Sequence, residues 1–219
     1  LRVENLSKNF NRLPVLKDVS FSLAKGEVIG LVGRQGAGKS TLFHLLNGAM
    51  TPSSGTIHFD GLHRRFSNRI QAQKFGIETV YQTSGLLNWF DFSANLLMDR
   101  DSGVETTRRT SGLVEQFNVT ENILLGRELK KISALGIIDW ACMVDITREL
   151  LAEFELPPDL AHEPVGNLSD EQRQVVMLLR TLNRSCRLLL LDDIIPILSF
   201  RRQKILLGKI KKLASQGTS

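Results

Sequence analysis

The sequence is poor in cysteine and contains no long apolar run. Its two cysteines, Cys142 and Cys186, lack the close spacing of a metal site or a redox pair, so a reducing cytosolic compartment fits the chain best. No apolar stretch approaches the roughly 20 residues of a membrane-spanning helix. No stretch has the pattern of a signal peptide either. The sequence therefore predicts neither a disulfide framework nor a segment that crosses a membrane.

The chain also lacks a large net charge of either sign. The 219 residues carry a formal net charge of +5 and a pI near 9.4, which is only mildly basic. Basic residues cluster briefly at 63–65 and 209–212, without interleaved aromatic residues, so solvated faces are expected there rather than a nucleic-acid surface. A 42% hydrophobic content allows a sizeable core in at most two domains. The sequence starts at Leu1 within a strand-like stretch and stops at "ASQGTS", where another strand could begin, so we expect a piece of a longer protein.

Hydrophobic spacing predicts strands and helices in alternation. Alternating patterns at 1–10 and 19–23 indicate antiparallel strands, and apolar runs indicate strands at 27–32, 55–61, 76–82 and 187–193. Helical spacing appears at 39–48, 142–156, 167–182 and 201–214. The apolar run "LLLL" leads into Asp192 and Asp193. Because side chains alternate along a strand, we expect these two carboxylates to point in opposite directions and to have different roles.

A tandem duplication interrupts the middle of the chain. The segments 83–101 and 110–128 align without gaps and match at eight of 19 positions, where chance predicts about one match. Two copies are too few for a solenoid. The second copy leads directly into the helical region, so we expect it to occupy the fold. The first copy, Thr83 to about Arg109, is expected to be an additional excursion.

The strongest chemical motif is "GRQGAGKST". It fits the phosphate-binding pattern G-x-x-x-x-G-K-[ST] with Gly33, Gly38, Lys39 and Ser40. Glycines let successive backbone N–H groups converge on an anion, and the following helix directs its positive end at the phosphates. The lysine adds a charge, and the serine hydroxyl can bind Mg²⁺. An ordinary glycine-rich turn is the alternative, which the complete motif between a strand and a helix disfavours.

At "LSDEQRQ" the sequence resembles the ATP-binding subunits of ABC transporters. The shared order is an N-terminal aromatic residue, the Walker A motif, Gln82, a helical insert, this signature and a Walker B run ending at Asp192. The resemblance covers essentially the whole chain and is closest to the monosaccharide-importer branch, on phrases such as "GIETVYQ", "VTENILLGRE" and "VGNLSDEQRQVV". Ser199 stands where that branch often has Ser or Thr in the D-loop.

The resemblance implies a set of ATP and Mg²⁺ ligands. Phe10 would stack on adenine, although a core phenylalanine is the simpler alternative. Ser40, Gln82 and Asp192 would hold Mg²⁺, while Asp193, Gln82 and Lys39 would act in catalysis. Ser169 and Gln172 would contact ATP bound to an opposite domain, and Ser169 or Asn167 could equally be a plain helix cap. The remaining loop contacts are expected from Gly33, Arg34, Gln35, Gly36, Ala37, Gly38 and Thr41.

Several positions depart from the family pattern. Asp193 replaces the catalytic glutamate and is one methylene shorter, and a misplacement of about 1 Å can cost about 10²-fold in rate. Ile194 and Ile195 follow it where the family has Pro-Thr. Asp170 and Glu171 occupy the middle of the signature, where carboxylates would repel a triphosphate unless they turn outward. The family's switch histidine has no counterpart here, because this sequence ends before the strand expected to carry it.

The resemblance implies an α/β P-loop NTPase fold, with a RecA-like mixed sheet flanked by helices, an antiparallel β-subdomain and a helical insert. Residues 1–82 and about 166–219 would form the ATP-binding core of one domain, and about 83–165 the insert. The implied function is ATP hydrolysis that powers a sugar importer by ATP-driven domain dimerisation. Partners would be a second ABC ATPase domain, transmembrane permease subunits and, indirectly, a sugar-binding protein, at the cytoplasmic face of the membrane. Nucleic acid is not an expected partner.

Two other interpretations stay open on these residues. One is a degenerate ABC domain that binds ATP as a regulatory or structural partner and hydrolyses little, which the departures at Asp193, Asp170 and Glu171 favour. The other is a non-transport ABC ATPase that acts on nucleic acid or ribosomes. Slow turnover with normal ATP binding would identify the first, and salt-dependent nucleic-acid binding the second.

Overall fold

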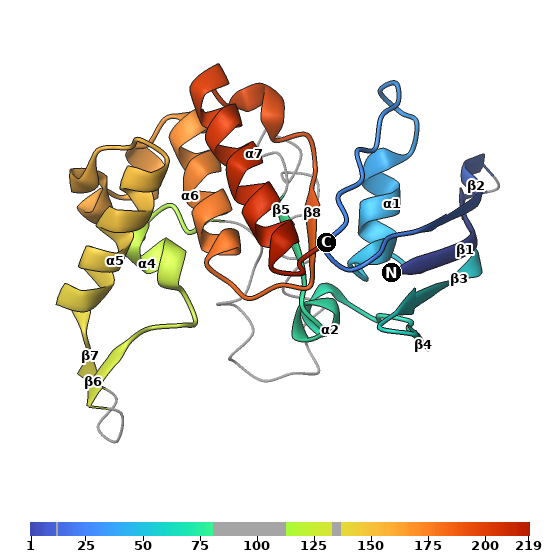
Figure 1. Cartoon of the computed structure of the whole chain (residues 1–219), viewed down its shortest axis with the longest axis horizontal. Helices are drawn as coiled ribbons and strands as arrows, with labels where there is room; N and C mark the ends of the chain where they lie inside the picture. Colours follow the sequence, from blue (N-terminus) through green and yellow to red (C-terminus); the bar gives the residue numbers. More distant parts are fainter. Residues whose placement is uncertain (12, 81–112, 133–136) are drawn as a thin grey trace. The chain divides into compact units, whose positions relative to one another are not determined.

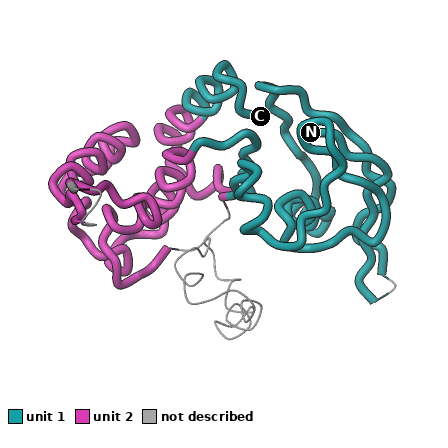
Figure 2. Tube along the Cα trace, turned by 90° about the horizontal axis from the view of Figure 1, so that it is seen from below, with its two compact units in different colours: residues 1–79, 185–192, 207–219 teal, residues 80–184, 193–206 magenta. Residues whose placement is uncertain are grey.

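Two structural units make up the described chain. The computed structural model describes residues 1–11, 13–80, 113–132 and 137–219 (Figure 1). Unit 1 comprises residues 1–79, 185–192 and 207–219, and unit 2 comprises 80–184 and 193–206 (Figure 2). The predicted division into an ATP-binding core and a helical insert at about 83–165 stays a prediction. Gln82 and the first copy of the duplication lie outside the described residues.

Unit 1 begins with an antiparallel sheet. Strands β1 (Arg2–Phe10), β2 (Leu13–Ser22), β3 (Ser54–Phe59) and β4 (Leu62–His63) lie in the order β2-β1-β3-β4, and all three neighbouring pairs are antiparallel. Val3, Leu6 and Ile57 are buried on its inner face. The predicted antiparallel subdomain is therefore confirmed.

A second sheet and two helices share the core of unit 1. Helix α1 (Lys39–Leu46) buries Leu42, Leu45 and Leu46, and α2 (Arg69–Lys74) starts at the capping side chain of Asn68. Strand β5 (Ile77–Val80) pairs with β8 (Leu188–Leu191). Both strands belong to predicted apolar runs, and Ile77, Leu188 and Leu190 are buried with the side chains of α1 in one hydrophobic cluster.

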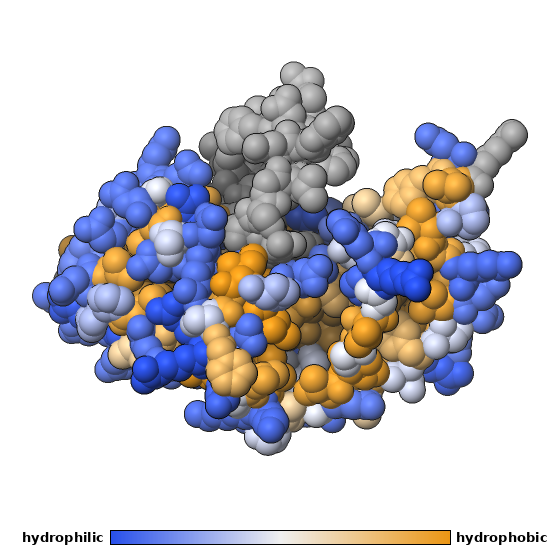
Figure 3. Space-filling view, turned by 90° about the horizontal axis from the view of Figure 1, so that it is seen from above, coloured by the Kyte–Doolittle hydropathy of each residue, from blue (hydrophilic) through white to orange (hydrophobic). Residues whose placement is uncertain are grey.

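The predicted buried strand at 27–32 is wrong for this structure. The residues have no strand conformation, and Val28, Ile29, Leu31 and Val32 are exposed by 59, 48, 43 and 95%. A strand persists only where a neighbour accepts and donates its backbone hydrogen bonds. No such neighbour pairs with 28–32 among the described residues. On the face shown in Figure 3, apolar residues reach the surface at several places.

Ser219 occupies the position beside the start of β8. Its N–H donates to the Arg187 carbonyl at 3.0 Å, and its carbonyl accepts from the Leu189 N–H at 2.8 Å. The Ser219 hydroxyl donates to the Ala24 carbonyl at 2.7 Å and accepts from the Gly26 N–H at 3.0 Å. The start of β8 is thus bonded by Ser219, and no described residue of 28–32 pairs with this strand.

Unit 2 is mainly helical. It contains α4 (Val119–Leu124), the two-stranded β6 (Lys130–Ile132) and β7 (Ile137–Ile138), α5 (Trp140–Glu153), α6 (Asp170–Leu182) and the first residues of α7 (Phe200–Ser215). Short 3₁₀ turns lie at η4 (Pro158–His162), η5 (Val165–Asn167) and η6 (Ile195–Ile197). Met143, Leu151, Phe154, Val175 and Leu178 are fully buried here. Within the described part of the chain, no helix combines the length and the apolar character needed to cross a membrane.

The described part of the second copy belongs to the core of unit 2. Its helix α4 begins with a capping box between Asn118 and Glu121 and buries Val119, Ile123 and Leu124. The buried Asn122 accepts from the Val114 N–H at 2.7 Å and donates to the Phe117 carbonyl at 3.1 Å. These bonds fix the turn that precedes α4, and the assignment of the second copy to the fold stays a prediction.

Deletion of Thr83–Arg109 tests the assignment of the two copies. It joins Gln82 directly to Thr110 and leaves the α4 segment intact. We expect the free energy of unfolding to change by less than about 1 kcal/mol, because loop length contributes only weakly to stability. Chemical denaturation of both chains measures this. Deletion of Thr110–Gly126, a shorter segment that contains α4, should by contrast unfold unit 2. Unfolding by the first deletion would show that the first copy is the structural one.

Candidate nucleotide site

Glycines shape the turn between residue 33 and helix α1. Gly36 and Gly38 have φ angles of 81 and 87°, in the left-handed region that glycine adopts without strain. A Cβ at Gly38 would also lie 2.8 Å from Leu16 Cδ2 and 3.0 Å from the Val15 carbonyl oxygen. The close approach of β2 and the turn both require glycine here. Gly33, Arg34, Gln35, Gly36 and Ala37 are exposed on the outside of this turn.

The N-terminus of α1 is open to an anion. Within the described part of the chain, no side-chain cap bonds its first turn, because Gly38 is the N-cap, and the turn contains no acidic residue. Its free N–H groups and the helix dipole suit a phosphate. Lys39 Nζ donates to the Gly33 carbonyl at 2.8 Å and to the Arg34 carbonyl at 3.0 Å, which holds the ammonium over the loop. Thr41 follows in the first turn and is half-buried.

Two oxygen ligands meet beside this loop. Ser40 Oγ donates to Asp192 Oδ1 at 3.3 Å, although 152 positions separate the two residues. A hydroxyl and a carboxylate are hard oxygen ligands, and Mg²⁺ in phosphate sites commonly takes one or two protein ligands with phosphate and water. The described residues hold no cluster of three or more His, Cys, Asp or Glu side chains that could bind a metal without such help. Ser40 and Asp192 therefore fit a phosphate-bound magnesium site better than an all-protein site.

His44, on the next turn of α1, is a neighbour of Asp192 that the sequence did not indicate. Burial lowers the pKa of its imidazole, Arg69 lowers it further, and Asp192 partly opposes both effects by raising it. The lowered pKa favours the neutral form of this imidazole. Only the folded packing of α1 on unit 1 reveals this, because the sequence places His44 on an ordinary amphipathic helix.

Strand alternation does not govern Asp192 and Asp193, and the opposed directions and different roles expected of them stay a prediction. Strand β8 ends at Leu191, so neither carboxylate lies on it. Asp193 has a φ of 51°, a left-handed conformation that aspartate tolerates better than most residues. Its side chain is exposed, and the next residue, Ile194, is only 1% exposed. A turn, rather than the pleat of a strand, therefore decides where Asp193 points.

Ser169 is the N-cap of α6, as one of the two interpretations predicted. Its hydroxyl accepts from the Gln172 N–H at 3.3 Å, and Gln172 Oε1 accepts from the Ser169 N–H at 2.9 Å. This capping box fixes both side chains at the start of the helix. A capped helix start can still present N–H groups to an anion, so the cap leaves a phosphate-contacting role possible.

The carboxylate of Glu171 has partners within the fold. Glu171 Oε1 accepts from the Ser199 N–H at 2.8 Å, and Glu171 Oε2 lies 2.7 Å from Arg202 NH1. Burial works to raise the pKa of this carboxyl, but the hydrogen bond from Ser199 and the contact with Arg202 prevail and lower it. Sequence spacing gave no sign of this contact, because Glu171 and Arg202 lie on different helices.

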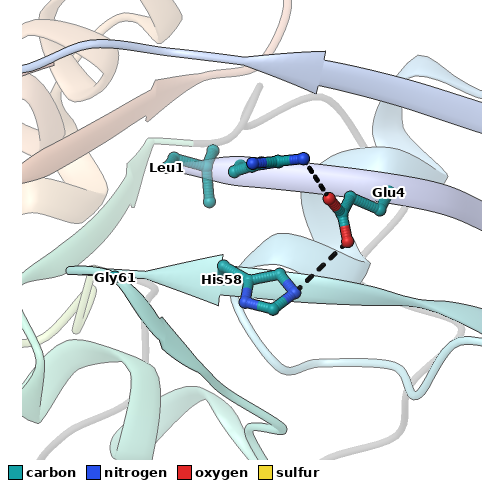
Figure 4. A pocket seen from close by; sticks show the side chains of 5 residues that line it. Leu1, Glu4, His58 and Gly61 are labelled. Carbon is teal, nitrogen blue, oxygen red and sulfur yellow. Dashed lines mark ion pairs between the residues drawn. The ribbon is translucent and has the colours of Figure 1, made fainter.

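Phe10 completes the candidate residues in the described part of unit 1. Phe10 ends β1, is 40% exposed, and lies with its ring centroid 5.2 Å from Lys8 Nζ. The exposed ring argues against a core role and leaves a face for stacking. A separate pocket is lined by Leu1, Arg2, Glu4, His58 and Gly61 (Figure 4). Glu4 pairs there with Arg2 at 2.6 Å and with His58 at 3.5 Å, so its charge is already satisfied.

Comparisons with known proteins agree on one family. The family model described as ABC transporter matches residues 16–195. The galactofuranose transporter ATP-binding protein YtfR of Escherichia coli K12 is 31% identical over 219 residues, covering 100% of this chain and 38% of that protein. A ribose import ATP-binding protein RbsA of Bacillus cereus is also 31% identical, with the same coverage. The chain thus spans less than half the length of these relatives.

Solved structures give the same fold. A dimeric post-hydrolysis state of the ATP-binding cassette MJ0796, bound to ADP and Pi, aligns with a TM-score of 0.73 at 19% identity, covering 99% of this chain and 84% of that one. The ATP-binding cassette MJ1267 aligns with a TM-score of 0.70 at 23% identity, covering 100% and 78%. The predicted α/β P-loop fold is therefore confirmed. With the family model matching 16–195, the chain belongs to the ABC transporter family.

Proposed function

We propose that this chain is the ATP-binding and ATP-hydrolysing domain that powers a sugar importer of the ABC family. The observation that carries the proposal is the hydrogen bond of 3.3 Å between Ser40 and Asp192. It joins the phosphate loop to the end of β8 within unit 1. A hydroxyl and a carboxylate placed together beside an open helix N-terminus are what a magnesium–triphosphate group needs.

The proposed ligands divide by role. The first-turn N–H groups of α1 and the Lys39 ammonium would hold the phosphates, Ser40 and Asp192 would hold Mg²⁺, and the exposed ring of Phe10 would stack on adenine. Bound Mg²⁺ would offset the negative charge on the phosphates during attack by water. Gln82 and Asp193 are proposed to orient that water. Asp193 has the required charge and a shorter reach than glutamate.

The signature residues Ser169 and Gln172 are proposed to contact ATP held by a second copy of this domain. The solved relative bound to ADP and Pi is a dimer, which supports this arrangement. Relatives that act in galactofuranose transport and ribose import support a sugar as the transported substrate. Membrane permease subunits are the proposed docking partners, at the cytoplasmic face of the membrane, with a sugar-binding protein acting through them.

A domain with little hydrolysis is the second candidate, and Asp193 favours it. Its exposed side chain, left-handed backbone and short reach are a poor match for a residue that must position water to within a fraction of an ångström. ATP binding does not depend on that residue. Under this alternative, ATP would still bring two domains together, while hydrolysis would be slow.

Complementation between two defective chains tests the proposed composite site. Lys39→Ala removes the phosphate-loop charge, and Ser169→Arg obstructs the signature. In a dimer of either variant, both composite sites are defective. A mixed dimer regains one intact site, from the phosphate loop of the Ser169→Arg chain and the signature of the Lys39→Ala chain. We expect each variant alone to lack ATPase activity above background. In the equimolar mixture, about half of the randomly paired dimers are mixed, and each mixed dimer has one intact site out of two. The mixture should therefore recover up to about a quarter of the unmodified chain's rate.

A second mixture controls for recovery of activity that does not need a site shared between two chains. Mixing Lys39→Ala with Ser40→Ala places both defects in the phosphate loop, so no intact site can form and no activity should return. Recovery in that mixture would contradict a site shared between two chains. If the unmodified chain binds Mg-ATP without measurable turnover, the domain with little hydrolysis becomes the better account.

A further inference from the structure

Glu171 places a carboxylate inside the segment that, under the proposed function, meets a triphosphate. It is the second residue of α6, two positions after the N-cap Ser169. A free carboxylate close to a phosphate would repel it, since like charges within a few ångströms repel strongly in partly desolvated surroundings. The segment therefore needs some means of offsetting this charge.

Arg202 supplies the offset. Its NH1 lies 2.7 Å from Glu171 Oε2, and the two side chains are only 18 and 28% exposed. Arg202 is itself held in place, because its Nε donates to the Phe154 carbonyl at 3.1 Å and its NH2 to the Glu155 carbonyl at 3.4 Å, both at the end of α5. The guanidinium thus fills a fixed position between α5, α6 and α7 within unit 2.

The other carboxylate oxygen of Glu171 is also engaged. It accepts from the Ser199 N–H at 2.8 Å, immediately before α7. Glu171 therefore joins the start of α6 to the loop that carries Ser199. Asp170, the preceding residue, is exposed and has no hydrogen bond or ion pair among the described residues. Only one of the two signature carboxylates is neutralised inside the fold.

We propose that Arg202 is a positioning residue of the signature segment, which keeps Glu171 neutralised and bound to Ser199 so that Ser169 can meet the triphosphate of a second copy's ATP. The inference rests on the proposed function, because it needs two copies to share ATP. It adds a residue outside the signature that this chain requires because acidic residues occupy the middle of its signature.

Nucleotide-dependent dimerisation of the chain measures this role. The probe is Mg²⁺ with a non-hydrolysable ATP analogue, and sedimentation velocity gives the dimer dissociation constant. Arg202→Met should weaken dimerisation by about tenfold or more, because it leaves a partly buried carboxylate unpaired at the interface. Adding Glu171→Gln to that variant removes the charge and should return the dissociation constant to within about threefold of the unmodified chain.

Arg201→Met is the matched control. Arg201 is adjacent to Arg202 in sequence, and its side chain is 79% exposed. It pairs with Glu155 at 2.5 Å. Exposed ion pairs of this kind contribute little to stability. It should dimerise like the unmodified chain. Glu171→Gln alone keeps an acceptor for the Ser199 N–H and should dimerise at least as well as the unmodified chain, which tests the inference even if Arg202→Met does not fold.

The outcomes distinguish neutralisation of the Glu171 charge by Arg202 from a purely structural role of this pair. Rescue of Arg202→Met by Glu171→Gln supports the proposal. A double variant as defective as Arg202→Met, or a Glu171→Gln chain that dimerises poorly, would show that the pair merely braces unit 2 and would overturn it. An unmodified chain that stays monomeric with nucleotide would overturn the shared site itself, and with it this inference. Normal dimerisation of Arg202→Met would overturn the inference alone.

Discussion

Lys39→Ala should abolish most of the stabilisation that Mg-ATP gives to this chain. A ligand present at 100 times its dissociation constant stabilises the folded state by about 2.7 kcal/mol. Lys39 is the only side chain that the structure holds on the Gly33 and Arg34 carbonyls within the described residues, and its ammonium would meet the phosphates there. Thermal unfolding with and without Mg-ATP measures the effect, each variant being compared with its own nucleotide-free state.

Lys74→Ala provides the control for this experiment. Lys74 is an exposed lysine in the last turn of α2, also in unit 1, and its removal changes the net charge by the same amount. It should leave the nucleotide-dependent shift intact. An unchanged shift in Lys39→Ala would place the phosphates elsewhere on the chain. Equal losses in both variants would indicate a general charge effect rather than a phosphate contact.

Asp193→Glu should raise ATP turnover by up to about 10²-fold, if a short carboxylate limits the rate. Asp193 is exposed in a left-handed turn, and the buried Ile194 fixes the chain directly after it. The side chain can therefore reach further only by becoming longer. Steady-state ATPase assays of the chain with Mg-ATP measure the change, and the dissociation constant for ATP should stay within about threefold, since the phosphate loop is untouched.

The competing explanation places the defect in the signature. The double change Asp170→Gly and Glu171→Gly tests it, and it should restore little activity, because Arg202 already neutralises Glu171. Asp193→Asn keeps the size of the side chain and removes its charge, so it should lower turnover. A chain that gains activity from the glycine pair but not from Asp193→Glu would show that the signature, rather than the carboxylate reach, limits hydrolysis.

Local sequence signals predicted much of the fold. The capped helix at 167–182 appears as α6 with Ser169 at its cap, and the glycine-bounded strand at 55–61 appears as β3. The phosphate loop also has the expected turn, with Gly38 in the left-handed region directly before α1. These features depend on residues within a few positions of one another. Backbone conformation and capping at such short range are set by the residue types themselves.

The sequence was a poor guide where a segment's conformation depends on a neighbouring segment that is distant in the chain. The apolar run at 27–32 has the composition of a buried strand, yet it pairs with no strand among the described residues. Apolar residues can predict that a segment needs burial but not which neighbour supplies it. The expectation for Asp192 and Asp193 rested on a related assumption. That expectation assumed strand geometry two residues beyond the end of β8.

The sequence by itself determined the phosphate loop, the helix caps and the family, because each follows from residue types at short and fixed spacing. The tertiary structure decided which distant groups meet. Only folding brings Ser40 to Asp192, lowers the pKa of His44 by burial beside Arg69, and joins Glu171 to Ser199 and Arg202. Such contacts arise from packing between separate elements, and charges or hydrogen bonds across them depend on distance and burial, which a linear pattern does not contain.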